Sequence, residues 1–383
     1  MDRSKTVLVV THNRVYGIPN ALRDYFVSKK HKRVVFIAHP LDNVDGDSYM
    51  QIYEQGEKVD EIKIRRSKSL GPINFLIDTL LTIYWVVFKL TKFDIYVGNN
   101  NLNALVGVLL RWTRKVGKSI YYTMDFSEDR LGNALLNFVY HKIDVFSIKR
   151  SDDRWVVSKG IILAKKEFLN INTKRYPHKI VPTGVWRNII KPNIHKGFDK
   201  NTIFFVGHLL KKQGVQNVLK SLPTVQKKVP GVKMVIVGDG PYRKTLEQIT
   251  KKLHITDHVV FTGIVKEHKE VFELMSKSCV GMATYEPQVS GKKHFTYYGD
   301  PGKIKDYLSV ALPIVMTDIS YNAKDIENAG CAIVTKYDSK DIAKAILSIM
   351  TDANHGQKYR KAAAEKSKEY DWNRIFDKAF RDY

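Results

Sequence analysis

The sequence predicts an α/β protein of two domains, each built on a doubly wound parallel sheet. Its 383 residues are 44% hydrophobic, enough to bury the cores of about two domains. Short apolar runs alternate with helical stretches along most of the chain, as in Rossmann-like sheets with crossover helices. A breaker-rich passage over 182–201 interrupts this alternation. We therefore expect domains over 1–190 and 191–365, followed by a terminal segment over 366–383.

Five apolar runs in the first half are predicted to be strands of the first sheet. They cover residues 6–10, 33–38, 94–97, 119–123 and 155–158. Helical stretches over 19–29, 73–90 and 101–112 lie between them, as crossover connections require. The apolar run within residues 1–13 is too short for a signal sequence, so we expect it to be the first strand.

The stretch over 73–90 is apolar enough to resemble a membrane span. Asn74, Asp78, Thr82 and Lys89 fall near one stripe at helical spacing. A spanning helix, by contrast, needs about 20 mostly apolar residues without a central carboxylate. We therefore predict a helix packed in the first domain. Contact of its aromatic face with a membrane surface, helped by the basic cluster at 65–68, is the alternative.

Three loops of the first domain follow predicted strands directly and carry candidate acceptor-side or catalytic residues. Gly17 lies in the turn after the first strand, and Asn100 ends the turn after the strand at 94–97. Asp125 is the carboxylate nearest the strand at 119–123. Ligands of doubly wound folds bind outside the carboxyl ends of strands. Asp125 is thus a candidate base, with capping of the next helix as the alternative.

The second half alternates again and is predicted to form the second sheet. Its strands are expected at 202–206, 233–237, 258–262, 279–283, 313–317 and 331–335, with helices starting near residues 215, 242 and 269. Glycine turns at 207–208 and 238–241 directly follow two of these strands. Glycine lets the backbone approach a ligand closely, so both turns are candidate binding loops.

The stretch over 297–318 places a turn, a helix start and a strand in an order suited to binding an anion. Asp300 is expected to cap the helix, and Pro301 fixes φ in its first turn, so the helix should run over about 301–311. Lys303 stands in that first turn. The helix dipole there already favours negative charge, so a cation is better placed for a phosphate than for helix stability.

Lys303 and Asp306 are spaced to share one face of this helix. The pair could bind a nucleotide through the cation and the carboxylate, or it could be a solvated surface pair. Lys305 is expected to point away from that face and to be dispensable.

The net charge of +24 predicts a polyanionic or phosphorylated partner. Nucleic acid, an anionic membrane surface and phosphorylated substrates all fit the charge alone. No zinc-finger, RNA-recognition or basic-zipper pattern is present, and no basic cluster alternates with aromatic residues. A specific nucleic-acid partner is therefore disfavoured. The basic clusters lie at 29–33, 63–68, 111–118 and 211–212.

The cysteines predict neither a disulfide framework nor a metal site. Cys279 and Cys331 each lie in an apolar segment, without metal-ligand spacing. A reducing, cytoplasmic compartment is therefore expected.

Four motifs in order resemble the donor domain of GT-B glycosyltransferases, in particular family 4 (glycosyl transferases group 1). They are FFVGHL at 204–209 with Gly214 and Val215, VIVGDGP at 235–241, VFTG at 260–263, and the helix stretch at 301–313. The passage at 181–185 resembles the interdomain connection of these enzymes. The segment at 367–383 resembles the terminal helix that crosses back to their first domain.

The resemblance implies roles for individual residues. The donor would contact Gly207, His208, Lys212, Gly240, Gly263, Gly302, Lys303 and Asp306. Asp125, Lys303 and Glu286 are the catalytic candidates, and Gly17 and Asn100 would lie on the acceptor side. No metal and no cofactor other than the nucleotide-sugar co-substrate is expected.

The sequence departs from the family pattern at the phosphate and acid positions. His208 and Gln213 stand where the family usually has Arg and Lys, so Lys211 or Lys212 is expected to substitute. Tyr298 stands in place of the first of two paired glutamates, and Asp306 in place of the second. Glu286 is the candidate for the missing acid.

The resemblance implies transfer of a hexose from a nucleotide-diphosphate sugar to a hydroxyl of a glycan or lipid-linked saccharide, as in polysaccharide biosynthesis. Retention of configuration is favoured, although the missing glutamate leaves inversion open. Two alternatives remain: a nucleotide-sugar epimerase on the same fold, and a non-enzymatic module that binds polyanions or membranes. The basic first domain could also hold the enzyme peripherally at the inner face of an anionic membrane.

Overall fold

The computed structural model describes residues 2–12, 16–41, 45–71, 73–190, 192–194, 197–287 and 295–383. The chain divides into two compact units. Unit 1 comprises residues 1–182 and 372–383, and unit 2 comprises residues 183–371. The division after Pro182 falls earlier than the boundary predicted at residue 190, and the returning segment begins at Trp372 rather than at residue 366.

Unit 1 is built around a mixed sheet. Its strands are β1 (Thr6–His12), β2 (Arg33–His39), β3 (Gly46–Glu54), β4 (Glu57–Arg66), β5 (Phe93–Asn99), β6 (Val116–Thr123), β7 (Asp153–Val156) and β8 (Lys179–Ile180). Its α-helices are α1 (Ile18–Ser28), α2 (Ile73–Tyr84), α3 (Asn101–Trp112), α4 (Ala134–Arg150), α5 (Lys159–Leu169) and α14 (Trp372–Ala379), and a π-helical turn at Trp85–Lys89 extends α2.

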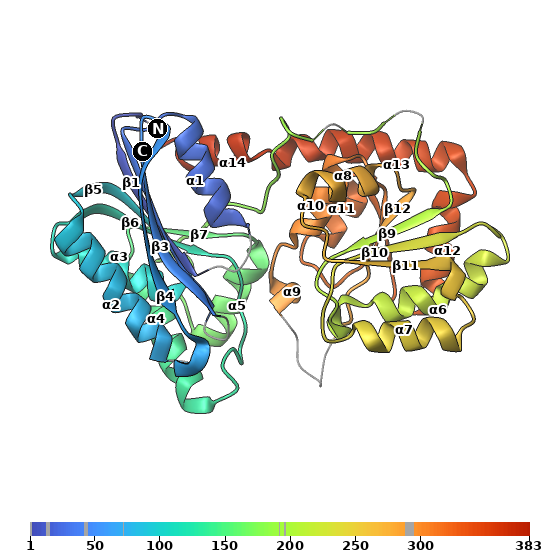
Figure 1. The fold of residues 1–383 in the computed structure, drawn as a ribbon, viewed down its shortest axis with the longest axis horizontal. Helices are drawn as coiled ribbons and strands as arrows, with labels where there is room; N and C mark the ends of the chain where they lie inside the picture. The colour runs from blue at the N-terminus through green and yellow to red at the C-terminus, as the bar shows by residue number, and fades with distance from the viewer. Residues whose placement is uncertain are drawn as a thin grey trace. The chain divides into compact units, whose positions relative to one another are not determined.

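The strand order of this sheet explains where its helices lie. Among the described residues the order is β4-β3-β2-β1-β5-β6-β7-β8, so the connections run in opposite directions from β1. Because crossovers are right-handed, the helices on the two sides of β1 cover opposite faces. Figure 1 shows α2, α3 and α4 side by side on one face, and α1 against α14 on the other.

The sequence prediction missed β3 and β4, which form an antiparallel hairpin at the sheet edge. Gln55 and Gly56 make the turn with positive φ angles of 53° and 94°. Two such φ values in a two-residue turn are typical of hairpins. The predicted all-parallel sheet is therefore extended by an antiparallel edge.

Helix α2 is amphipathic in the reverse of the usual sense. Three residues of the predicted polar stripe, Asn74, Asp78 and Thr82, are fully buried, as the predicted packed helix requires. The fourth, Lys89 in the π-helical turn, is exposed. Its apolar side chains face solvent: Leu76 is 60% exposed, and Phe88 in the following turn is 73% exposed. No helix in the described ranges combines the length and hydropathy that crossing a bilayer requires.

Asp78 on this stripe is the centre of a buried polar network. One carboxylate oxygen lies 3.2 Å from Arg66 Nε and 3.3 Å from His12 Nε2, and the other accepts a hydrogen bond from Ser48. His39 donates or accepts at both ring nitrogens, one of them toward Ser48. Burial, together with the charges of His12 and Arg66, lowers the pKa of His39 well below its usual value. The network thus explains why α2 turns its polar stripe inward.

Unit 2 is built around a fully parallel sheet. Its strands are β9 (Thr202–Val206), β10 (Lys233–Val237), β11 (Val259–Gly263), β12 (Val280–Ala283), β13 (Ile314–Thr317) and β14 (Ala332–Thr335). Its α-helices are α6 (Val215–Gln226), α7 (Arg243–Lys252), α8 (His268–Ser276), α9 (Phe295–Tyr298), α10 (Gly302–Ser309), α11 (Ala323–Asn328), α12 (Ser339–Met350) and α13 (Ala353–Lys366).

Each strand predicted for the second domain is present, within two residues at either end. The order among described residues is β11-β10-β9-β12-β13-β14, so the direction of winding reverses between β9 and β12. Accordingly, α6 and α7 lie on one face of the sheet and α10, α11 and α13 on the other (Figure 1). Ligands of doubly wound folds bind at the carboxyl ends of strands where the winding reverses.

Candidate functional site

The candidate site lies where β9 and β12 end. Gly207 follows β9 with φ at 142°, a backbone conformation that side chains disfavour. A Cβ on Gly207 would lie 3.0 Å from Lys303 Nζ and 3.5 Å from its Cε. Glycine at this position therefore leaves room for the Lys303 side chain at the end of the strand.

Lys303 extends from the first turn of α10 to this strand end. Its Nζ donates a hydrogen bond of 2.7 Å to Gln213 Oε1 and lies 4.0 Å from the centre of the Phe205 ring. Burial lowers the pKa of Lys303 to about 7, although the charge of Asp306 opposes this. Because Gln213 is neutral, it positions the Lys303 amine without supplying a negative charge. A bound anion would supply that negative charge.

Asp306 is the carboxylate next to Lys303 on the helix. Burial raises the pKa of Asp306 to about 7, against the opposing charges of Lys305 and Lys303. Both groups are thus held close to the pH at which their charge changes. Titratable groups with shifted pKa values at a strand end are typical of functional sites.

The glycine turns predicted at 207–208 and 238–241 pack against each other. The amide of Gly238 donates to the carbonyl of Gly263, and the amide of Gly207 donates to the carbonyl of Val237. A Cβ on Gly240 would lie 2.8 Å from the ring of His208. The carboxyl ends of β9, β10 and β11 therefore form a continuous edge of close-packed backbone, with the His208 side chain exposed to solvent.

Glu286 and the two lysines of the 211–212 cluster meet at the turn that carries Gln213. The Glu286 amide donates to the Lys212 carbonyl over 3.0 Å, and Lys211 Nζ lies 4.0 Å from the Glu286 carboxylate. This turn is thus fixed to the loop after β12. Glu286 therefore helps to position that turn.

Two expectations about the start of α10 are wrong. Asp300 does not cap the helix, because Pro301 is the N-cap residue and α10 runs over Gly302–Ser309. The Asp300 carboxylate instead accepts hydrogen bonds from the Thr183 amide and from Asn322, at 2.8 and 2.9 Å. Gly302 packs near Thr183, whose Cγ2 would lie 3.6 Å from a Cβ at that glycine.

Lys305 is the second correction, because it is fully buried and forms an ion pair with Asp300. Its ammonium also lies 4.8 Å from the centre of the Tyr370 ring. The helical spacing correctly separated Lys305 from the face of Lys303 and Asp306, but the opposite face packs against the protein. Lys305 is therefore a structural residue and not a dispensable one.

The first-domain candidates lie at loops after three strands of unit 1. Gly17 and Asn100 are the N-cap residues of α1 and α3, which follow β1 and β5. Asn100 has φ 73° and ψ 164°, a region that non-glycine residues rarely occupy. Asp125 does not cap α4, because the N-cap of that helix is Asn133. The Asp125 carboxylate instead accepts a hydrogen bond of 2.8 Å from Arg130.

The structure adds Gln213 to the candidate residues. The sequence marks it as a departure from the family's lysine, but its contact with Lys303 is long-range in the sequence. The motif position was the only signal that could have pointed to it.

This fold is that of the GT-B glycosyltransferases. The structure matches WaaG, a glycosyltransferase involved in lipopolysaccharide biosynthesis, with a TM-score of 0.67 and 14% identity, covering 97% of this chain and 98% of WaaG. It matches the HepE protein of Anabaena in complex with UDP with a TM-score of 0.67 and 13% identity, covering 99% and 100% of the two chains.

Residues 187–366 match the family model for glycosyl transferases group 1, so the chain carries a domain of that family. The chain is 34% identical over 65 residues to a mannosyltransferase of Mycobacterium tuberculosis, the GDP-mannose-dependent alpha-(1-6)-phosphatidylinositol monomannoside mannosyltransferase. The match covers 17% of each chain. One component of the Arabidopsis thaliana phosphatidylinositol N-acetylglucosaminyltransferase is 24% identical over 257 residues, 65% of this chain and 55% of the relative. The matches thus span less than two thirds of these relatives.

Proposed function

We propose that the protein transfers a sugar from a nucleotide-diphosphate sugar to a hydroxyl acceptor, without a metal ion. The observation that carries this proposal is Lys303, whose poorly compensated ammonium is held by Gln213 beside Gly207, at the strand ends of a group 1 glycosyltransferase domain. A diphosphate placed there would meet the cation and the backbone N–H groups of the first turn of α10.

The chemistry follows from the charge that develops as the bond to the sugar breaks. Negative charge grows on the departing phosphate, and a preorganised cation at a helix N-terminus stabilises it more in the transition state than in the ground state. Asp306, on the same helix face as Lys303, would accept hydrogen bonds from ribose hydroxyls. The acceptor proton would pass to Asp125 or to the departing phosphate. Tyr298 cannot replace the carboxylate of the first family glutamate, and we propose that Glu286 supplies this acid. We also propose that the sugar is transferred with retention of configuration.

The relatives support classes of donor and acceptor. The mycobacterial relative is named for GDP-mannose, and HepE was solved with UDP. The mycobacterial and Arabidopsis relatives are both named for phosphatidylinositol-based substrates. We therefore propose a GDP- or UDP-linked hexose as donor and a lipid-linked or glycan hydroxyl as acceptor.

Release of the nucleoside diphosphate tests the transferase proposal. Each nucleotide sugar is incubated with the protein, with and without a lipid or glycan extract. We expect one donor to release its nucleoside diphosphate much faster with the extract. Isomerisation of the sugar without acceptor, and without release, would identify an epimerase.

The outward apolar face of α2 supports peripheral contact with a membrane. Leu76, Leu80 and Phe88 lie on this face and are exposed, and Lys89 and Lys92 next to its end are exposed cations. Exposed apolar residues beside cations are typical of helices that lie at the surface of anionic bilayers. We propose that unit 1 uses this face to bind the membrane that holds the acceptor.

Replacing Leu76 and Leu80 with glutamine should weaken this contact. Both residues are already exposed, so the free energy of unfolding should change by less than about 0.5 kcal/mol, whereas flotation with phosphatidylglycerol vesicles should fall severalfold. Ile264→Gln is the matched control, because Ile264 is 75% exposed on unit 2. Equal flotation of the double variant and the control would contradict the proposed membrane face.

A further inference from the structure

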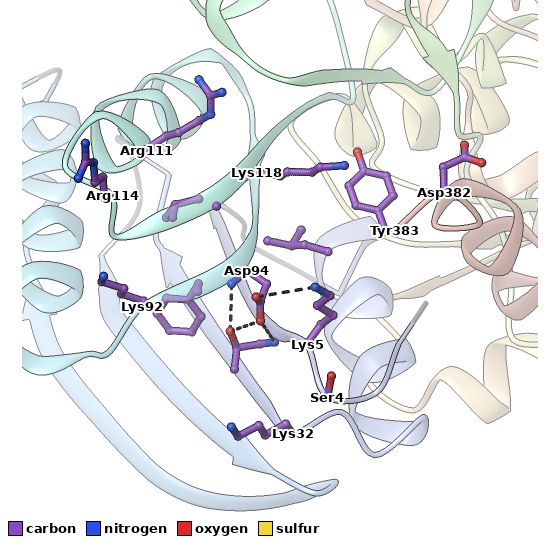
Figure 2. Close-up of a pocket in the computed structure, with 15 residues that line it drawn as sticks. Ser4, Lys5, Lys32, Lys92, Asp94, Arg111, Arg114, Lys118, Asp382 and Tyr383 are labelled. Atoms are coloured by element: carbon purple, nitrogen blue, oxygen red, sulfur yellow. Dashed lines mark hydrogen bonds and ion pairs between the residues drawn. The ribbon is translucent and has the colours of Figure 1, made fainter.

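A basic hollow lies at the amino edge of the unit 1 sheet. Its volume is about 960 Å³, and Figure 2 shows its lining side chains. The starts of β1, β5 and β6 form its base, at Thr6, Phe93 and Val116. The candidate residues Gly17, Asn100 and Asp125 follow the carboxyl ends of these same strands. The hollow is therefore at the opposite edge of the sheet from the proposed acceptor side. Its charged residues are Lys5, Lys32, Lys92, Asp94, Arg111, Arg114, Lys118 and Asp382.

The carboxylates around the hollow are already engaged. Asp94 accepts hydrogen bonds from the amide and the hydroxyl of Thr6, at 2.8 and 2.9 Å, and lies 4.0 Å from Lys5 Nζ. Asp382 lies 3.4 Å from Lys179. The six cations of the lining outnumber these two carboxylates, so the hollow keeps a net positive charge.

Four cations of the lining form no ion pair with a carboxylate within 4 Å among the described residues. They are Lys32, Lys92, Arg114 and Lys118, all of them exposed. Arg111, by contrast, lies 2.8 Å from Asp152. Like charges around one concavity repel each other and focus the field within it. A multivalent anion in the hollow would relieve that repulsion.

Arg114 occupies a backbone position that usually belongs to glycine. Its φ is 58°, and it ends α3 in a turn in which the Lys115 amide donates to the Leu110 carbonyl. Glycine adopts this left-handed conformation at helix ends without the steric cost of a side chain. An arginine at the rim of the hollow is therefore not explained by the needs of the turn.

Lys118 is positioned by an aromatic ring. Its ammonium lies 4.8 Å from the centre of the Tyr383 ring, and the Tyr383 hydroxyl donates to Asp153. The ring thus holds a cation next to the hollow without neutralising it. In Figure 2, Lys118 and Tyr383 lie together at one side of the pocket.

We propose that this hollow binds a phosphate-bearing anion with at least two negative charges. Arginine binds phosphate through paired N–H donors, and lysines add point charges around it. The site is separate from the proposed donor site, which lies in unit 2. The same chemistry is offered by a soluble polyphosphate or nucleotide and by the headgroup of an anionic lipid.

The test compares two triple variants of the full chain that lose the same charge. The pocket variant is Lys32→Ala, Arg114→Gly and Lys118→Ala, which leaves the cations beside α2 in place, and the control is Lys227→Ala, Lys228→Ala and Lys252→Ala on unit 2. Arg114→Gly should keep or raise the melting temperature, because glycine suits the turn. Lost binding with an unchanged melting temperature therefore reports on the site and not on folding.

Calorimetry with inorganic tripolyphosphate and flotation with phosphatidylglycerol vesicles distinguish the two sources of phosphate. We expect the pocket variant to lose roughly fivefold in affinity per cation removed, and the control to lose much less. Tripolyphosphate binding that follows this pattern identifies a soluble ligand, and vesicle binding alone that follows it identifies a headgroup. Equal losses in both variants, or no binding of either probe to the unaltered protein, would overturn the proposal.

Discussion

Replacing Lys303 with methionine should lower kcat about a hundredfold while leaving the free energy of unfolding unchanged or slightly higher. Burial already lowers the pKa of Lys303 to about 7, so the folded protein gains little from the charge. If the ammonium instead stabilises the departing phosphate, its loss removes about 3 kcal/mol at the transition state. Initial rates at saturating donor and acceptor, together with thermal unfolding, measure the two quantities.

Lys344→Met is the control for this comparison, because Lys344 is exposed and its ion pair with Asp341 is at the surface. It should change neither rate nor stability appreciably. A Lys303→Met enzyme with the rate of the unaltered protein would remove Lys303 from the chemistry.

Replacing Lys305 with methionine should lower stability, unlike Lys303→Met, and destabilise unit 2 by about 3–5 kcal/mol. Lys305 is fully buried, and without it the Asp300 carboxylate stays buried without its cation. The melting temperature of the unit should fall by roughly 10 °C.

The double variant Asp300→Asn, Lys305→Met distinguishes this charge effect from simple loss of packing. It removes the uncompensated carboxylate while keeping a side chain that can accept from the Thr183 amide. Its melting temperature should therefore exceed that of Lys305→Met. An equal or lower value would show that packing of the lysine, and not its charge, matters.

Lys303 and Lys305 illustrate what the sequence could and could not predict in the candidate site. The order of strands, glycine turns and helix start predicted the position of Lys303, because these signals are local. Helical spacing also separated Lys305 from Lys303 correctly. Whether the face of Lys305 is buried depends on Asp300, Asn322 and Tyr370, which the fold brings together. Helical spacing alone does not predict such contacts.

Helix α2 shows the same limit in the first domain. The spacing of Asn74, Asp78 and Thr82 predicted an amphipathic helix, but periodicity defines two faces without saying which is buried. The inward direction comes from Arg66, which supplies a buried charge for Asp78. The hairpin of β3 and β4 was missed, although the turn at 55–56 and the alternation around it carried a signal.

The most direct measurement is calorimetry of GDP- and UDP-sugars at pH 8 in two buffers with different ionisation enthalpies. With a pKa of about 7, about nine in ten Lys303 amines are neutral at pH 8 in the free protein. A bound diphosphate favours the ammonium, so binding should take up close to one proton, and affinity should fall as the pH rises from about 7 to 9. Lys303→Arg, which stays charged, should take up clearly less, because only Asp306 is then left to gain a proton. Binding of one donor with this proton uptake is the predicted result. A folded protein that binds no nucleotide sugar, or that binds one with equal proton uptake in Lys303→Arg, would contradict the role of Lys303 in donor binding.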